Sequence, residues 1–288
     1  MDFQLKSLRS LVGKAITRVE SLAARRQKNA FHAVVGPGLR PGAEHQLLRL
    51  KDEVGFAGKR VLEIGGDLEG TVARACLALG AKHVTSINHD RRFQSRQNER
   101  SSFRRMDGAA LDFPAAHFDL VIGLAVLEHI RPFKQVLESV WRVTRPNGLV
   151  YLQGGPLWFS RKGHHLVLIG ATGQRWRFNG RDGGINPIED WDHLRLEPAE
   201  LLGKLVLRGC SPVDAQAIVD YVYGTELINR YSANELGKFF GESRLTIRRC
   251  IPSQEPARQE VVLADLASQY RLPEREFRIS SIAFLASR

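Results

Sequence analysis

The chain has 288 residues, 43% of them hydrophobic, so it can bury a full core as one large domain with an insertion. Its three cysteines form no CxxC pair, which argues against a disulfide framework or a zinc knuckle. The formal net charge of +11 favours anionic partners, although many enzymes are simply basic and no nucleic-acid-binding signature accompanies the charge. Because no signal-peptide core and no run of about 18 apolar residues occur, a cytoplasmic protein is expected.

The N-terminal segment predicts a basic amphipathic helix over residues 3–26. Apolar residues recur at i, i+3, i+4 and i+7 from Leu8 to Ala23, with lysines and arginines between them. Such a helix either docks its apolar stripe on its own domain or makes a peripheral contact with an anionic inner membrane surface. A cleaved targeting peptide is a third interpretation. Residues 1–45 are therefore expected to form a helical extension that includes a glycine- and proline-rich loop at 36–42.

Residues 46–155 alternate between short apolar runs and helical patterns. Strands alternating with helices give a mostly parallel sheet with right-handed crossovers. The expected fold class is therefore α/β, a Rossmann-like doubly wound sheet that binds ligands at the carboxyl ends of its strands. Strands are predicted at 60–65, 83–88, 118–127 and 149–155, and helices at 67–80 and 130–144.

The pattern changes after the last of these strands. Residues 180–194 are rich in glycine, asparagine and aspartate and predict an irregular loop, while 197–209 and 232–243 predict short helices. Residues 243–252 and 277–287 predict an antiparallel pair of edge strands. We therefore expect an inserted acceptor lid at 156–240 and closing edge strands of the core within 241–288.

The loop after the first strand, VLEIGGDLEG, combines glycines with acids: Glu63, Gly65, Gly66, Asp67, Glu69 and Gly70. A dinucleotide-binding loop would carry glycine at 67, and its pyrophosphate would face acids here. Two like charges 4 Å apart repel by about 1 kcal/mol in water and about 4 kcal/mol at an effective dielectric of 20. S-adenosylmethionine has a positive centre and no phosphate, so it avoids this repulsion.

Four blocks in the same order resemble the class I S-adenosylmethionine-dependent methyltransferase family. They are the glycine loop at 61–70, the strand HVTSIN at 83–88, the stretch from FRRMDG to LEHI at 103–130, and WRVTRPNGLVYL at 141–152. The resemblance covers roughly residues 58–155, about a third of the chain. It implies S-adenosylmethionine as cofactor and methyl transfer as activity.

The resemblance also implies roles for single residues. Glu63 would accept a hydrogen bond from the cofactor ammonium, and Asp107 would take the adenine amino group. Asn88 stands where the family usually carries an acid for the ribose, so either Asn88 accepts one hydroxyl bond or Asp90 serves instead. The expected cofactor-binding residues are Glu63, Gly65, Gly66, Asp67, Gly70, Asn88, Asp107, Gly108, Leu124 and Ala125.

The methyl acceptor requires a group that removes its proton, and a histidine near neutral pKa suits this task. The candidates are His129, in the Glu-His pair of the third block, and His164 and His165 after the fifth strand. Asp190, Asp192 and His193 offer metal-ligand types but no telling spacing, so no metal site is predicted.

The fourth strand is followed by GLAVL and not by the Asn-Pro-Pro-Tyr-like sequence of the family's adenine- or glutamine-methylating members. This favours O-methylation of a small molecule, a sugar or glycan, or a lipid. An RNA-modifying methyltransferase and a non-catalytic cofactor-binding module are the alternatives.

Overall fold

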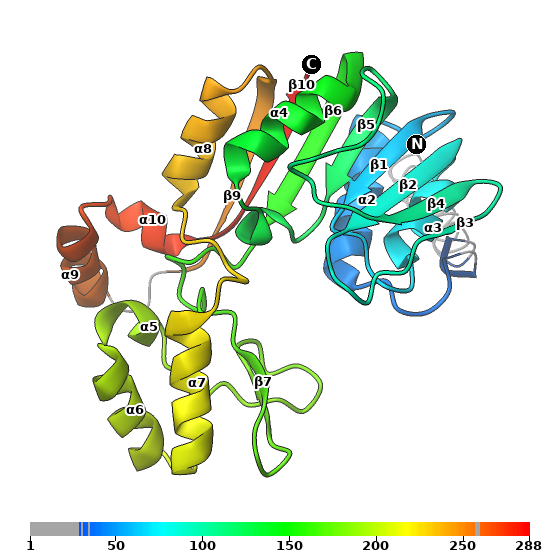
Figure 1. Cartoon of the computed structure of the whole chain (residues 1–288). Helices are drawn as coiled ribbons and strands as arrows, with labels where there is room; N and C mark the ends of the chain where they lie inside the picture. The colour runs from blue at the N-terminus through cyan, green and yellow to red at the C-terminus, as the bar shows by residue number, and fades with distance from the viewer. Residues whose placement is uncertain (1–28, 30, 34, 257–259) are drawn as a thin grey trace, which may run out of the picture.

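The computed structural model describes residues 29, 31–33, 35–256 and 260–288 (Figure 1). The predicted amphipathic helix at 3–26, and with it the predicted membrane contact, lies outside these residues. An eight-stranded sheet, ordered β3-β4-β2-β1-β5-β6-β10-β9, forms the centre of the fold. Its strands are β1 (Arg60–Ile64), β2 (His83–Asn88), β3 (Arg96–Gln97), β4 (Ser101–Arg105), β5 (Phe118–Gly123), β6 (Thr144–Gly154), β9 (Thr246–Gln254) and β10 (Ile279–Ser287).

The sheet is parallel at its centre and antiparallel toward both edges. β1 pairs in parallel with β2 and β5, β2 with β4, and β5 with β6, whereas β10 runs antiparallel to β6 and β9. The predicted doubly wound α/β fold with late antiparallel edge strands is therefore confirmed. The chain winds outward from β1 to β4 and then returns to place β5 on the other side of β1, so the switch point lies between β1 and β5.

Helices cover both faces of the sheet. They are α2 (Pro41–Glu53) and α3 (Thr71–Ala78) on one face, and α4 (Phe133–Val143) and α8 (Ala233–Glu242) on the other. Helix α2 was not predicted and begins inside the predicted loop 36–42, because Pro41 at its first turn has a backbone angle already suited to a helix. Its Leu47 and Leu50 are fully buried, so this helix belongs to the core.

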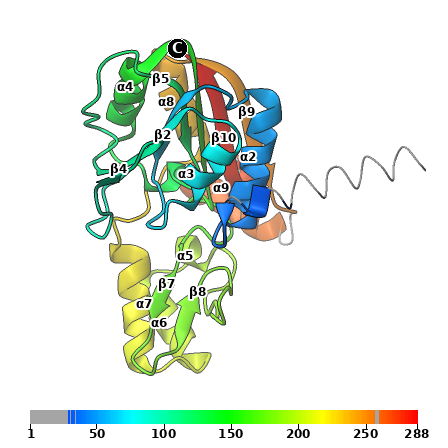
Figure 2. The ribbon, with the colours of Figure 1, turned by 90° about the vertical axis from the view of Figure 1, so that its right-hand side faces the viewer.

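The lid follows β6 directly and so lies at the carboxyl edge of the sheet, below it in Figures 1 and 2. The helix α7 and the hairpin of β7 and β8 were not predicted. The lid elements are β7 (Val167–Ile169), β8 (Arg175–Arg177), α5 (Asp192–Arg195), α6 (Pro198–Leu207) and α7 (Pro212–Gly224).

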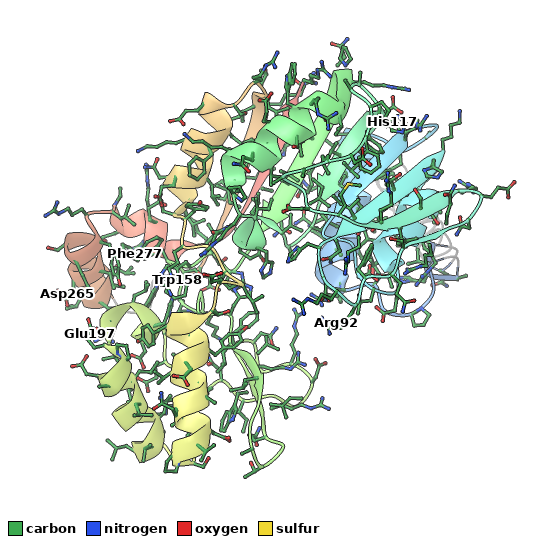
Figure 3. The ribbon with its side chains drawn as sticks, viewed as in Figure 1. Arg92, His117, Trp158, Glu197, Asp265 and Phe277 are labelled. Carbon is green, nitrogen blue, oxygen red and sulfur yellow. The ribbon has the colours of Figure 1, made fainter. Side chains whose placement is uncertain are left out.

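Two further helices, α9 (Glu260–Tyr270) and α10 (Glu274–Arg278), come between β9 and β10 in the sequence. Their Leu263, Leu266 and Phe277 join the lid's hydrophobic cluster, which also contains Trp158; Figure 3 labels Trp158 and Phe277. The segment 241–288 therefore contributes to the lid as well as to the sheet. Within the described ranges, no helix is both long and apolar enough to cross a bilayer.

Candidate active site

The glycine loop turns sharply at the end of β1. The N–H groups of Gly65 and Gly66 both donate to the carbonyl of Ile87, at 2.9 and 3.0 Å. Gly65 has a φ of +77°, and a Cβ there would lie 2.4 Å from Cγ1 of Val126. A Cβ on Gly66 would lie 1.8 Å from Oγ of Ser86. Both positions thus require glycine because of the protein's own packing, in addition to any approach by a ligand.

Glu63 carries its carboxylate into this turn. The residue is only 3% exposed, and its Oε2 atom has no hydrogen-bond partner in the described part of the chain. Burial raises the pKa of Glu63 from 4.5 to about 8. A buried carboxylate without a cation is unfavourable, so this position fits the ammonium group of the predicted cofactor.

Asp67 occupies the amino end of helix α3. Its carboxylate accepts hydrogen bonds from the Thr71 N–H at 2.9 Å, the Thr71 hydroxyl at 2.8 Å and the Val72 N–H at 3.2 Å. Partial burial alone would raise the pKa of Asp67, but these hydrogen bonds outweigh it and lower the pKa. The helix end where a pyrophosphate would bind is therefore already filled by a negative charge. The predicted helix 67–80 begins only at Thr71, since residues 67–70 form this cap and Gly70 is left-handed.

Asn88 ends β2 with its side chain already engaged. Its Nδ2 donates to the carbonyl of Gly66 at 2.8 Å, and its Oδ1 accepts the Asp90 N–H at 2.9 Å. Asp90 in turn pairs with Arg92 at 2.6 Å. Neither candidate for the ribose offers an unengaged acceptor oxygen without rearrangement, so the role of both toward the ribose stays a prediction.

The remaining predicted cofactor residues lie along the same edge. Asp107 is exposed, with one oxygen accepting the Ala109 N–H at 2.9 Å, and Gly108 follows it against Val136. Leu124 is half-buried, and Ala125 is exposed at a φ of +53°. Their position at the carboxyl ends of β4 and β5 is the one expected for a ligand site in such a sheet.

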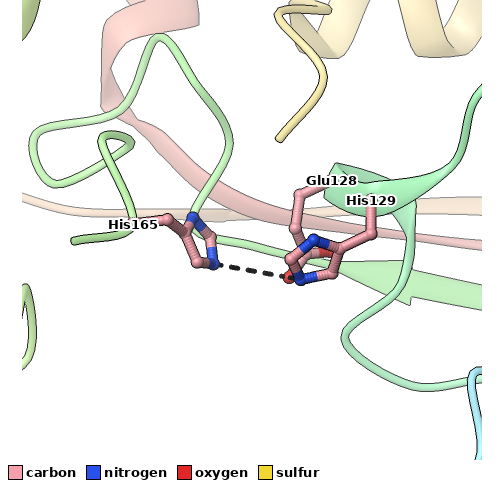
Figure 4. A group of neighbouring side chains, drawn as sticks. All are labelled: Glu128, His129 and His165. Carbon is pink, nitrogen blue, oxygen red and sulfur yellow. Dashed lines mark ion pairs between the residues drawn. The ribbon is translucent and has the colours of Figure 1, made fainter. Parts of the chain in front are cut away.

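Glu128, His129 and His165 converge beside this loop and are called the triad from here on (Figure 4). One ligand atom of each lies within 4.8 Å of the others. Oε1 of Glu128 lies 3.8 Å from Nε2 of His165 and 3.9 Å from Nε2 of His129. Burial raises the pKa of Glu128 to about 8 and lowers the pKa of His165 to about 3, so His165 is neutral at physiological pH. Burial also lowers the pKa of the more accessible His129.

His164 points away from the triad, although it neighbours His165. Its ring is fully buried, its Nδ1 accepts the Leu166 N–H at 3.2 Å, and its centroid lies 5.4 Å from that of His193. His165 adopts a left-handed backbone with φ of +49°, and the two rings end in different surroundings. Of the three predicted catalytic candidates, the structure thus brings His129 and His165 together and places His164 outside their group.

The three residues of the lid considered as metal ligands, Asp190, Asp192 and His193, each have separate partners. Asp192 pairs with Lys204 at 2.8 Å, Asp190 lies 3.4 Å from Arg161, and His193 bonds the carbonyl of Trp158 at 2.8 Å. They form no common site.

Contacts far apart in the sequence hold the triad, and the sequence carries no signal for them. Nδ1 of His129 lies 2.8 Å from the carbonyl oxygen of Leu227, and the Tyr221 hydroxyl donates to the carbonyl of His165 at 3.1 Å. The buried Asn229 donates from Nδ2 to the carbonyls of Leu127 and Ile130 at 2.6 and 3.1 Å. The return of the chain from the lid thereby fixes the turn that carries Glu128 and His129.

Known proteins resemble this chain in sequence and in fold. Residues 62–152 match the family model described as a methyltransferase domain. The chain is 29% identical over 153 residues to a probable S-adenosylmethionine-dependent methyltransferase of Mycolicibacterium smegmatis, covering 51% of each chain. It is 28% identical over 135 residues to an uncharacterized methyltransferase of Mycobacteroides abscessus, covering 43% of this chain and 51% of that protein. The chain therefore spans about half the length of these curated relatives.

A solved structure shares the fold. An S-adenosylmethionine-dependent methyltransferase from Mesorhizobium loti superimposes with a TM-score of 0.51 at 17% sequence identity, over 87% of this chain and all of that one. At this identity the likeness concerns the fold alone. The matched region 62–152 contains residues 62–70 of the glycine loop, Asp107 and two members of the triad.

Proposed function

We propose that this chain carries a class I S-adenosylmethionine-dependent methyltransferase domain and transfers the methyl group to an oxygen of a small-molecule, glycan or lipid acceptor. The proposal rests on one packing contact between the cofactor loop and the turn that carries Glu128 and His129. Val126 packs on Gly65 of the cofactor loop, and Glu128 and His129 follow Val126 in the next turn. The site predicted for the cofactor and the triad are therefore continuous.

The residues of the loop would hold the cofactor by charge and by shape. Glu63 supplies a buried carboxylate for the ammonium, and Asp107 supplies an exposed carboxylate for the adenine amino group. Asp67 keeps phosphate away from the helix α3 because its charge already fills that helix end. When bound, S-adenosylmethionine supplies a methyl group on a positively charged sulfur.

The triad is where the acceptor hydroxyl loses its proton. Positioned acid–base groups typically contribute a factor of about 10² to 10⁴ to the rate. His129 is reachable, with 42% of its side chain exposed, while the neighbouring Glu128 and His165 are buried. The lid, whose chain begins directly after β6, would bring the acceptor to this edge of the sheet.

The acceptor class rests on two features of the chain. The segment after β5 reads Leu-Ala-Val-Leu, without the residues that hold a flat nitrogen acceptor in other members of the family. The net charge of +11 favours an acceptor that carries negative charge.

Calorimetry with S-adenosylmethionine, followed by transfer of labelled methyl groups into candidate extracts, tests the proposal. We expect saturable binding below millimolar concentration and label in an alkali-stable, non-protein product. Binding without transfer to any acceptor would favour a cofactor-binding module, and salt-dependent labelling of RNA would favour the nucleic-acid alternative. If S-adenosylmethionine does not bind at millimolar concentration, both the O-methyltransferase and the RNA-methyltransferase hypotheses are refuted.

A further inference from the structure

The triad brings two imidazole nitrogens and one carboxylate oxygen to a common centre. Glu128 and His129 come from the short 3-10 helix at Leu127–His129, and His165 comes from the loop that follows β6, 36 positions after His129 (Figure 4). The separations of 3.8 and 3.9 Å between the Glu128 oxygen and the two nitrogens are too long for hydrogen bonds. The three groups therefore face one another at ion-pair distance without hydrogen bonds between them.

These separations are close to those between neighbouring ligands of one metal ion. Metal–nitrogen and metal–oxygen bonds of about 2.0–2.2 Å in tetrahedral geometry place neighbouring ligand atoms about 3.3 Å apart. The Glu128 oxygen would need to approach each nitrogen by only about 0.5 Å, and the two nitrogens, which lie within 4.8 Å of each other, would need to approach by at most about 1.5 Å. Two imidazoles and a carboxylate are the ligand set of zinc and of several other divalent transition metals, whereas magnesium and calcium prefer oxygen ligands only.

The orientation of His129 is the one expected of a ligating histidine. Nδ1 of its ring lies 2.8 Å from the carbonyl oxygen of Leu227, and because a carbonyl can only accept, Nδ1 carries the proton. The lone pair is then on Nε2, the atom that faces Glu128. A backbone carbonyl behind the ring is a common means of fixing the tautomer of a metal ligand.

Glu128 supplies a second, independent observation. Its side chain is 1% exposed, and its Oε2 atom has no hydrogen-bond partner among the residues that the structure describes. Nδ1 of His165, also buried, has no partner within the same ranges. Buried polar atoms normally find partners, so a buried carboxylate with an unpartnered oxygen favours a ligand with positive charge beside it.

The geometry points to a divalent transition-metal site formed by Glu128, His129 and His165, with positions left open for water or an acceptor oxygen. Three protein ligands and an open position are typical of metal sites that act on a substrate. A cation here would lower the pKa of a hydroxyl bound to it. This catalytic role rests on the proposed function, whereas metal binding itself does not.

Metal binding can be measured on the full chain without cofactor or acceptor. After treatment with a chelator and its removal, zinc is titrated by calorimetry, and cobalt is titrated while the visible spectrum is recorded. We expect one equivalent of each metal to bind, with a visible cobalt spectrum typical of four- or five-fold coordination, and magnesium to compete poorly.

Variants identify the ligands. His165→Ala and His129→Ala should each weaken zinc binding by about 100-fold or more, since loss of even a supporting partner costs 10- to 100-fold. His129→Ala is the safer of the two because that side chain is 42% exposed and its loss leaves no buried cavity. His45→Ala, an exposed histidine on α2, is the control and should bind zinc as the wild type does.

Equal zinc affinity in the wild type and in folded His129→Ala, or no binding by the wild type, would overturn the metal site. If metal binds as expected but no acceptor is methylated, the proposed function fails and the metal site stands. If methylation proceeds unchanged in the chelated protein and no metal binds, the metal site fails and the proposed function stands.

Discussion

Nδ1 of His129 lies 2.8 Å from the carbonyl oxygen of Leu227, which ties a side chain of the sheet edge to the chain returning from the lid. A backbone carbonyl cannot be removed by mutation, but its position depends on a neighbour. Asn229, 2% exposed, bonds the turn at residues 127–130 through three hydrogen bonds: to the carbonyls of Leu127 and Ile130, and from its own N–H to the carbonyl of Glu128. The geometry of His129 therefore depends on Asn229.

Asn229→Ala should destabilise the protein and impair the site together. The variant leaves two buried carbonyls without their side-chain donor, which costs about 2–4 kcal/mol in the free energy of unfolding. Denaturant unfolding measures this loss, and labelled-methyl transfer should fall with it. Asn234→Ala, at an exposed position of α8, is the control, with an expected change below about 0.5 kcal/mol. If the Asn229→Ala protein were as stable as this control, the hydrogen bonds of Asn229 would not be what holds the turn at residues 127–130.

The raised pKa of Glu63 predicts how the free energy of unfolding depends on pH. Its pKa in the folded protein is about 8, above its ordinary value of 4.5, so the folded state holds the proton more tightly than the unfolded state. The stability from this group is complete below pH 4.5, decreases as the pH rises from 4.5 to 8, and is absent above 8. At 1.36 kcal/mol per pKa unit, the rise from 4.5 to about 8 corresponds to a change on the order of 5 kcal/mol.

Comparison with Glu63→Gln isolates this effect, because the buried Glu128 titrates in the same range in both proteins. The unfolding free energy of the wild type should fall relative to the variant between pH 5 and 8. Cofactor affinity of the wild type should rise over the same range, since the ionised carboxylate is the form that binds an ammonium. Parallel stability curves for the two proteins would show that Glu63 is not buried in the manner described.

Substitutions of Asp67 distinguish its role as the cap of helix α3 from its predicted contact with the cofactor. Asp67→Ala removes the acceptor of three hydrogen bonds at the start of α3 and should lower the free energy of unfolding by about 1–2 kcal/mol. Asp67→Asn retains one acceptor oxygen and should lose less. Because the carboxylate is engaged by the helix, we expect cofactor affinity measured by calorimetry to change little in either folded variant; a large loss would establish the predicted contact with the cofactor.

Asp107 offers the sharpest test of the cofactor site. Asp107→Ala should weaken S-adenosylmethionine binding by about 1–3 kcal/mol, the scale of a lost charged hydrogen bond. Asp112→Ala is matched to it, because Asp112 follows in the same loop with 89% of its side chain exposed. Equal calorimetric affinities for the two variants would remove Asp107 from the adenine site.

The sequence predicted what local pattern encodes. The strands β1, β2 and β5 follow from apolar runs, and the glycine loop and the Glu128-His129 pair follow from short motifs. Helix α7 was not predicted, although the sequence carries a recognisable helix start. Ser211 is a cap residue whose side chain accepts the Asp214 N–H, and Pro212 occupies the first turn. The pairing of His165 with His129 could not be predicted, because it depends on the path of the loop after β6. The support from Leu227 comes from a backbone atom, which leaves no trace in residue type.

The neighbouring histidines His164 and His165 form a matched pair for the acceptor site. His165→Ala removes a ring that faces Glu128 and should slow methyl transfer by about 10² or more, with cofactor affinity unchanged. His164→Ala removes a ring buried beside His193 and the partner of the Leu166 N–H, so it should lower stability while a folded fraction retains turnover per molecule. Single-turnover rates normalised to the cofactor-binding fraction distinguish the two effects. If His164→Ala slows transfer as much as His165→Ala in this assay, the acceptor reaches the lid's interior and the triad is not the place of deprotonation.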